Sequence, residues 1–503
     1  MLTRRYIRYK KCLCHLMQRV FPQNIPPRLC LFFITVFIHS LATLIAGIYL
    51  GLEGAQNAGV ALLILLLYLG TFVLIFFMAL PRVAGRLSHH TRRLKLSARV
   101  SIVLLFIGII AEAVIITPCL INNDALLLGK WENPIVPNDR IAISYQACEV
   151  LFEGKNPYTN INIIHLIQEF PSLKPSILLK GRFADVYPHP TEEQFNQVLN
   201  EALANPDNPP QEFISSVNYP SGSFLFDIPF VSLGIDLRWL YFICTLILIG
   251  LIAWRSPPNL RLLVIVGGLV SLPIWNAIIG GSMDPLYILL ILLGWILRRR
   301  LWIAAILMGL ALTCKQTALI FILLYLILQL RESGWRQAFQ SAIAIVGVFL
   351  ITNIPFIAAD PAAWLSGVLA PMLEPYVPEG VGIVSFATLS TSPVPSLPFS
   401  LIEAAVLAGT LIWYYFNCRK APQTALLLGI LPLFFAWRSL SSYFAFIPLL
   451  VLGAVIIEEV NISNEDTKIY SAGSASQSPQ ENPKARQRSG RIPQRCVVPP
   501  RPR

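Results

Sequence analysis

Long runs of apolar residues, separated by short polar segments, recur along the chain. Many of these runs hold roughly 17 to 22 residues, the length that an α-helix needs to cross about 30 Å of hydrocarbon. The residues in a run do not alternate between apolar and polar, as strands of a membrane barrel do. The pattern therefore predicts an all-α polytopic membrane protein. The predicted spans are 29–51, 59–80, 100–121, 237–254, 261–279, 283–298, 301–314, 316–331, 338–357, 399–417, 421–436 and 441–458.

Composition agrees with this interpretation. Of the 503 residues, 55% are hydrophobic and 13% are charged, and the mean hydropathy is +0.63. That is more apolar material than a water-soluble core uses. The net charge of +12 lies at the N-terminus, in short loops and in the tail, so it indicates membrane orientation and not a nucleic-acid partner. The nine cysteines show no paired spacing, which indicates neither a disulfide framework nor a metal site.

Basic residues orient the predicted spans. Residues 1–28 hold seven Lys or Arg and no acid, and segment 81–99 holds six and no acid, so both are predicted to be cytoplasmic. Loops 122–218 and 358–398 then lie outside, and the tail 459–503 is expected to be disordered in the cytoplasm. The apolar segment 219–234 is short, and counting it as a span would put four basic loops outside, so we predict that it does not cross. We expect a multi-pass plasma (inner) membrane protein with both termini cytoplasmic.

A helical pattern stands near the start of the first large outer loop. In DRIAISYQACEVLFEGKNPY (139–158), apolar residues fall on one face of a helix that begins near Asp139 and stops at Gly154. This face consists of Ile143, Ala147, Val150 and Leu151. The helix is too short and too polar to span, so we expect it to lie along the outer membrane surface before an Asn-Pro-Tyr turn.

The order of five motifs resembles the GT-C superfamily of membrane glycosyltransferases, in particular glycosyltransferase family 87, the polyprenyl-phosphate-mannose type. The motifs are the helix and Asn-Pro-Tyr turn just described, NYPSGSFLFDIPF (218–230), IIGGSMDPLYILLILL (278–293), MGLALTCKQTALIFIL (308–323) and WRSLSSYFAFIPLL (437–450). The resemblance covers roughly residues 100–458, and two extra spans in 29–99 precede it. It implies a GT-C-like bundle of about 11–13 transmembrane helices with a large first extracytoplasmic catalytic loop.

The resemblance also implies an activity. Such an enzyme moves mannose or a similar sugar from a polyprenyl-phosphate-linked donor to a glycolipid or glycan acceptor on the extracytoplasmic face, with inversion. The donor carries a good leaving group, so a single carboxylate that removes the acceptor proton is sufficient. We expect no cofactor and no metal, because neither a phosphate-binding glycine loop nor a metal-binding motif occurs. The expected partners are this donor, the acceptor and membrane lipids.

Two carboxylates are candidates for the catalytic base. Asp139 matches the family's catalytic residue by its distance from Asn156-Pro157-Tyr158, and Asp124, near the exit of the third span, is the reserve candidate. The sequence Pro-Asn-Asp before an amphipathic run is also typical of an ordinary helix N-cap. A catalytic base and a helix cap therefore both stay open for Asp139.

Several other residues are candidates for binding the donor phosphate or the substrates. Lys315 interrupts an apolar run, so it should face a cavity or an anion, or else reach along its stem to the headgroups. Arg438 is a second cation, although a Trp-Arg pair at the end of a span is also a common interfacial anchor. Asp284 begins a predicted helix, where a carboxylate stabilises the positive dipole end. The remaining candidates are Asn156, Tyr158, His165 and Tyr219.

Two other functional classes compete with a glycosyltransferase. A secondary transporter or lipid flippase would share the many helices and broken segments, but such proteins usually show repeated halves, and we find no convincing internal repeat. A non-catalytic scaffold would use the outer loops to bind partners. It predicts that Asp139 can be replaced without loss of activity.

Overall fold

The computed structural model describes residues 26–51, 57–81, 139–258, 260–390 and 392–458. Asp124, the third predicted span, nearly all of segment 81–99 and the tail lie outside these ranges. Within them, regular structure is helical apart from two strands of two residues each, β1 (Glu379–Gly380) and β2 (Arg438–Ser439), which pair in parallel. The structure confirms the predicted all-α class.

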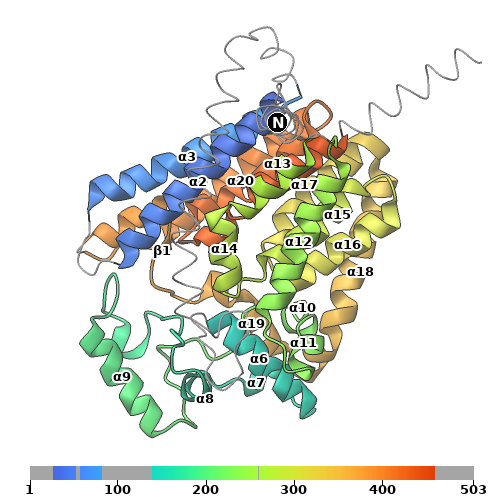
Figure 1. Ribbon diagram of the computed structural model, residues 1–503. Helices are drawn as coiled ribbons and strands as arrows, with labels where there is room; N and C mark the ends of the chain where they lie inside the picture. The colour runs from blue at the N-terminus through green and yellow to red at the C-terminus, as the bar shows by residue number, and fades with distance from the viewer. Residues whose placement is uncertain (1–25, 52–56, 82–138, 259, 391, 459–503) are drawn as a thin grey trace, which may run out of the picture. The chain divides into compact units, whose positions relative to one another are not determined.

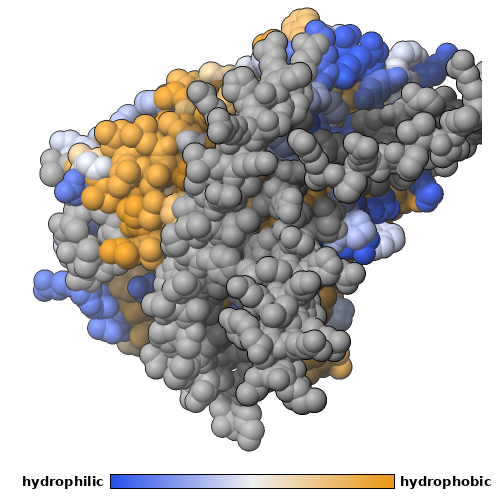
Figure 2. Space-filling model, turned by 45° about the horizontal axis from the view of Figure 1, so that its top comes forward, coloured by the Kyte–Doolittle hydropathy of each residue, from blue (hydrophilic) through white to orange (hydrophobic). Residues whose placement is uncertain are grey.

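Six helices in the described ranges are long and apolar enough to cross a membrane, or up to seven if one bent pair counts as a single span. Five of them are α2 (Pro27–Gly51), α3 (Ala58–Ala79), α12 (Arg238–Arg255), α18 (Trp335–Ala359) and α20 (Leu397–Asn417), and the sixth is the unlabelled segment Ser441–Glu458. Figure 2 shows hydrophobic residues gathered in a broad patch on the visible face, with hydrophilic residues beside it. The helices therefore indicate a multi-pass membrane protein.

Two predicted spans are broken in the structure. The bent pair, α13 (Arg261–Leu269) and α14 (Leu272–Ile279), replaces the single span 261–279 and turns by 53°. Pro273 stands in the first turn of α14, where proline begins a helix readily but does not continue one. The predicted span 421–436 is instead a series of short helices, two of which have a proline in their first turn. They are η3 (Pro422–Thr424), α21 (Ala425–Leu428) and η4 (Leu431–Phe435).

Three further apolar helices are shorter than a typical span and pack against the longer helices. They are α15 (Asp284–Ile296), α16 (Leu301–Cys314) and α17 (Ala318–Ser333). α16 lies between α15 and α18, and α15 also contacts α12 (Figure 1). Neighbouring helices cover α15 closely, whereas α16 and α17 each keep an exposed apolar face that includes Trp302 and Leu319.

Short helices from the loop predicted to lie outside gather at one end of the long helices (Figure 1). They are α6 (Asp139–Phe152), α7 (Pro157–Asn160), α8 (Ile163–Glu169), η1 (Gly181–Phe183) and α9 (Glu192–Ala204). α10 (Gly222–Leu225), α11 (Ile228–Ser232) and α19 (Pro361–Leu373) lie at the same end. Segment 219–234 thus forms two helices of four and five residues, which agrees with the prediction that it does not cross.

The two N-terminal helices share a core with the later part of the chain. Tyr68 and Phe72 of α3 contact Phe434 of η4 and Phe444, with ring centroids 5.1 to 6.2 Å apart. Aromatic pairs at this spacing contribute about 0.5–1.5 kcal/mol beyond simple burial. Phe444 directly follows η5 (Ser441–Tyr443), so α3 supports the loop that carries Tyr443. α3 also contacts the short helix η2 (Ile383–Leu389).

Candidate functional site

α6 carries the candidate base and ends where the sequence predicts. Asp139 is its first described residue, and Gly154 follows its end with a φ of +72°, a left-handed conformation that glycine adopts without strain. Its surroundings differ from the prediction, because residues 139–145 are all buried and not only one apolar face. α8, α10 and α11 contact the helix. α6 therefore lies inside the protein and does not rest on a membrane surface.

The Asp139 side chain is directed toward another segment of the loop. Its Oδ2 accepts a hydrogen bond of 2.9 Å from the backbone N–H of Ser176, and the residue is only 9% exposed. Among the described residues, this bond goes to a distant segment and not to the backbone of α6, so the geometry does not favour a helix cap. Burial raises the pKa of the Asp139 carboxyl, and the Ser176 N–H and the positive charge of Arg438 oppose this rise.

Arg438 lies within electrostatic reach of Asp139 and belongs to what we term the outer cluster, namely Asp139, Tyr376, Glu379 and Arg438. The pairing of β1 with β2 sets Glu379 opposite Arg438, and an ion pair of 2.9 Å joins Glu379 Oε2 to Arg438 Nη2. The guanidinium also lies 4.3 Å from the centroid of the Tyr376 ring. Burial alone would lower the pKa of Arg438, but Glu379 and nearby tyrosines raise it above its usual value, so the guanidinium stays charged.

Backbone contacts hold the outer cluster together. Leu178 forms an antiparallel bridge with Tyr376, two residues after the Ser176 N–H that binds Asp139. Gly380 has a φ of +140°, and a Cβ atom there would lie 2.3 Å from the carbonyl oxygen of Ser439. Only glycine permits this close approach of β1 to β2. Three segments far apart in the sequence are thus fixed around the carboxylate and the guanidinium.

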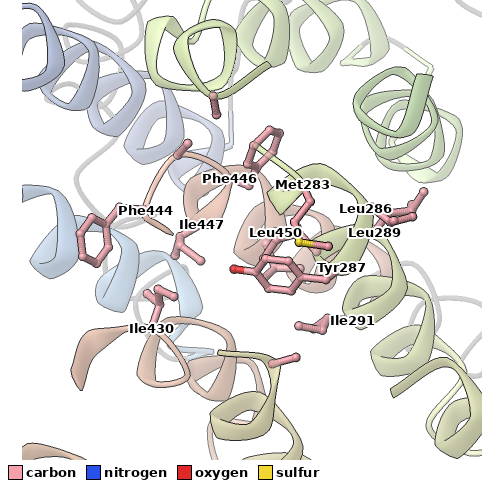
Figure 3. Packing of buried hydrophobic residues seen from close by; sticks show 14 of the residues in the cluster. Met283, Leu286, Tyr287, Leu289, Ile291, Ile430, Phe444, Phe446, Ile447 and Leu450 are labelled. Atoms are coloured by element: carbon pink, nitrogen blue, oxygen red, sulfur yellow. The ribbon is translucent and has the colours of Figure 1, made fainter. Parts of the chain in front are cut away.

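Lys315 and Asp284 form a second group, the inner pair. Lys315 Nζ lies 2.7 Å from Asp284 Oδ1, and the two side chains are 5% and 1% exposed. The ammonium also lies 4.6 Å from the ring centroid of Tyr443 and 5.6 Å from that of Tyr287. Figure 3 shows Tyr287 in the apolar packing beside Met283. Of the two alternatives for Lys315, the structure therefore shows the one in which the ammonium faces an anion. That anion is the protein's own Asp284, and the Lys315 side chain does not reach toward lipid headgroups.

Sequence reasoning missed a third buried group, centred on Arg140. Its Nη2 lies 3.4 Å from Asp227 Oδ2 and donates to the carbonyl of Ser223 at 3.0 Å, and its Nη1 hydrogen-bonds to the Tyr241 hydroxyl. Nη1 also donates to the carbonyl of Gly281 at 3.2 Å. Arg140 thereby ties α6 to α10, α12 and the start of α15. The available signal was Asp227, a charged residue within the otherwise apolar segment 219–234, since buried charges require partners.

Other predicted residues have different surroundings. Tyr158 packs against Phe224 and Phe356, and its hydroxyl donates a 2.8 Å hydrogen bond to the carbonyl of Tyr219, so it belongs to the core. Asn156 caps α7 through the backbone N–H of Tyr158.

His165 and Tyr219 complete the set. His165 is exposed on α8 beside Asp207, at 3.6 Å, outside both the outer cluster and the inner pair. The Tyr219 side chain lies in the field of Tyr443, Asp139 and Arg438, and burial raises its pKa. Tyr219 and Tyr443 therefore stand where the outer cluster and the inner pair approach each other.

The long apolar helices indicate a multi-pass membrane protein, and buried polar groups lie at one end of its bundle. Residues 218–455 match the family model described as Glycosyltransferase family 87, which confirms the resemblance and indicates a glycosyltransferase. The match includes Tyr219, Asp284, Lys315 and Arg438, whereas Asn156, Tyr158, His165 and Asp139 precede it. Neither a curated protein nor a solved structure matches the chain.

Proposed function

We propose that the protein transfers mannose or a similar sugar from a polyprenyl-phosphate-linked donor to a glycolipid or glycan acceptor at the extracytoplasmic face, with inversion. The observation that carries this proposal is the approach of one buried carboxylate, Asp139, to one charged guanidinium, Arg438. A base and an anion-binding group are the two functions that such a transfer requires.

In the proposed reaction, Asp139 removes the proton from the acceptor hydroxyl while that oxygen bonds to the anomeric carbon of the donor. The bond between the anomeric carbon and the phosphate oxygen breaks, and its electron pair leaves with the phosphate. A raised pKa makes the Asp139 carboxylate a stronger base at neutral pH. Arg438 stabilises the charge that develops on the leaving phosphate.

The surroundings of the two cations favour Arg438 over Lys315 for contact with phosphate. The charge of Lys315 is balanced by Asp284, and both side chains are buried. The acid beside Arg438 is Glu379, whose side chain is 49% exposed, so a phosphate can take its place without leaving a carboxylate stranded in the interior. We therefore assign the inner pair a supporting role beneath Tyr443.

The distribution of basic residues supports an extracytoplasmic site. α16 begins directly after Arg300 and ends directly before Lys315, and α17 ends near Arg331. Arg255 ends α12, and Arg419 follows the end of α20. At the ends of these helices, Arg255, Arg300, Arg331 and Arg419 thus lie opposite the site, and basic helix ends normally face the cytoplasm.

A transfer assay tests the proposal. The full chain in proteoliposomes receives a labelled polyprenyl-phosphate sugar, and Asp139→Asn is compared with the unaltered protein at equal amounts of folded protein. We expect a loss of about 100-fold or more in kcat, as for removal of a general base. Asp207→Asn, which changes an exposed acid of the same loop, serves as the matched control and should keep full activity.

Two results would overturn the proposal. Full activity of Asp139→Asn would remove Asp139 from the mechanism and direct the search to Asp124, which lies outside the described residues. Absence of transfer by the unaltered protein from hexosyl and pentosyl donors, together with movement of the lipid-linked sugar across the bilayer, would favour a flippase.

A further inference from the structure

An apolar groove runs along the membrane-facing surface of α17 and α18 and is completed by α20. Its volume is about 460 Å³, within the range of roughly 300–1,000 Å³ typical of small-molecule sites. The residues that line it are all apolar and include Leu323, Leu330, Trp335, Phe339, Ala342 and Leu411. Because α18 and α20 are long enough to span the bilayer, lipid chains are the natural neighbours of this groove.

Four basic residues, which we term the basic cluster, gather at one end of the groove. Arg331 follows Leu330 in the last turn of α17, Arg336 follows Trp335 at the start of α18, and Arg419 and Lys420 come just after α20. Arg419 Nε donates a 2.7 Å hydrogen bond to the carbonyl of Arg331, which ties the end of α17 to the end of α20.

The charges of the basic cluster are not neutralised within the protein. In the part of the chain that the structure describes, none of the four residues forms an ion pair with a carboxylate, whereas the nearby Arg298 is paired with Glu458 at 2.7 Å. Glu332 follows Arg331 in the last turn of α17, and its side chain is exposed to the surroundings of the protein. Arg331 Nε is buried and has no hydrogen-bond partner among the described residues, and its guanidinium lies 4.8 Å from the Tyr415 ring.

We propose that an anionic diacyl phospholipid occupies this site, with an acyl chain in the groove and its phosphate against the basic cluster. The groove supplies an apolar lining for the chain, and the guanidinium groups supply the planar donors that phosphate oxygens accept well. Basic side chains near a membrane surface attract anionic lipid by about fivefold in affinity per residue. The inference is independent of glycosyl transfer, because the site lies at the opposite end of α17 from Lys315.

Native mass spectrometry of the full chain in neutral detergent tests this inference. The probes are phosphatidylglycerol and phosphatidylcholine with the same acyl chains. We expect phosphatidylglycerol to bind at least about tenfold more tightly than phosphatidylcholine. The double variant Arg336→Gln/Lys420→Gln should reduce this preference about tenfold or more, and it should fold normally because both side chains are exposed.

Two further variants separate the groove from general charge effects. Ala342→Trp fills the groove and should weaken both lipids. Arg255→Gln alters an arginine that stacks on Trp254 at the end of α12, 4.9 Å from its ring, and should change neither. The inference fails if both lipids bind equally, if Arg255→Gln causes the same loss as the double variant, or if inorganic phosphate displaces phosphatidylglycerol while Ala342→Trp leaves its binding intact.

Discussion

Breaking the inner pair is expected to destabilise the protein more than removing both of its charges. Lys315→Met leaves the Asp284 carboxylate 1% exposed beside the Ser282 hydroxyl and without its cation. Removing one partner of a buried ion pair costs about 3–5 kcal/mol, whereas replacing both by neutral side chains of similar volume is often nearly neutral. Lys315→Met/Asp284→Asn should therefore recover most of the stability that Lys315→Met loses.

Thermal or denaturant unfolding in detergent, applied to the unaltered protein, both single variants and the double variant, measures the coupling. We expect an interaction free energy of about 2 kcal/mol or more, because the Nζ–Oδ1 distance is 2.7 Å and both side chains are buried. Additive effects of the two substitutions would refute the reasoning, because the pair would then contribute nothing specific to the fold.

The transfer assay on the same four proteins decides whether Lys315 contacts substrate. If the inner pair is only a support, the double variant should be within about tenfold of the unaltered protein in kcat, a change of about 1.4 kcal/mol in the barrier. A double variant that folds with normal stability and yet loses more than about 100-fold would show that the ammonium itself acts on the donor phosphate. That result would reverse the order in which we rank Arg438 and Lys315.

Four further predictions concern the loops around Asp139. Arg438→Gln should lower kcat/KM for the donor about 10- to 100-fold, since a hydrogen bond to a charged group contributes about 1.5–3 kcal/mol, and Glu379→Gln, which keeps the guanidinium, should not reproduce that loss. The acid limb of kcat/KM should lie above the ordinary aspartate range, because burial raises the pKa of Asp139; an identical limb in Asp139→Asn would contradict this. The stability that this carboxyl contributes in its protonated form is lost as pH rises through its raised pKa, so Asp139→Asn should unfold at neutral pH at the same or a higher temperature than the unaltered protein. Tyr158→Phe loses the 2.8 Å bond to Tyr219 and should lower the free energy of unfolding by about 1 kcal/mol with little change in kcat, as measured by unfolding and transfer.

The end of α6 was predictable from the sequence, but its burial was not. Periodic apolar residues and Gly154 defined the helix and its end, because these signals are local. Arg140 and Ser144 made the other face look solvent-exposed. Their burial depends on Asp227 and Tyr241, which approach only after folding, so no local pattern reveals it.

Apolar length predicted where helices lie better than whether each is a single span. Segments 261–279 and 421–436 are apolar enough to cross, yet Pro273, Pro422 and Pro432 divide them into shorter helices. A span surrounded by lipid and a short helix surrounded by protein have the same composition, because both are apolar on every side. Lys315 and Asp284 were likewise each identified separately, but their pairing depends on the packing of α15 against α16.

The three buried polar groups differ in how their charges are balanced, and this difference argues for where chemistry occurs. Arg140 with Asp227 and Lys315 with Asp284 are pairs inside the protein, so a substrate gains little from either. In the described part of the chain, Asp139 accepts its hydrogen bond from a neutral backbone N–H, and Arg438 meets its acid at an exposed position. Since catalysis requires interactions that strengthen in the transition state, a carboxylate held by a neutral N–H and a guanidinium whose acid is half-exposed are better able to respond when a proton and a phosphate change charge. The closed pairs then serve to hold α6, α10 and α15 so that these two groups keep their separation.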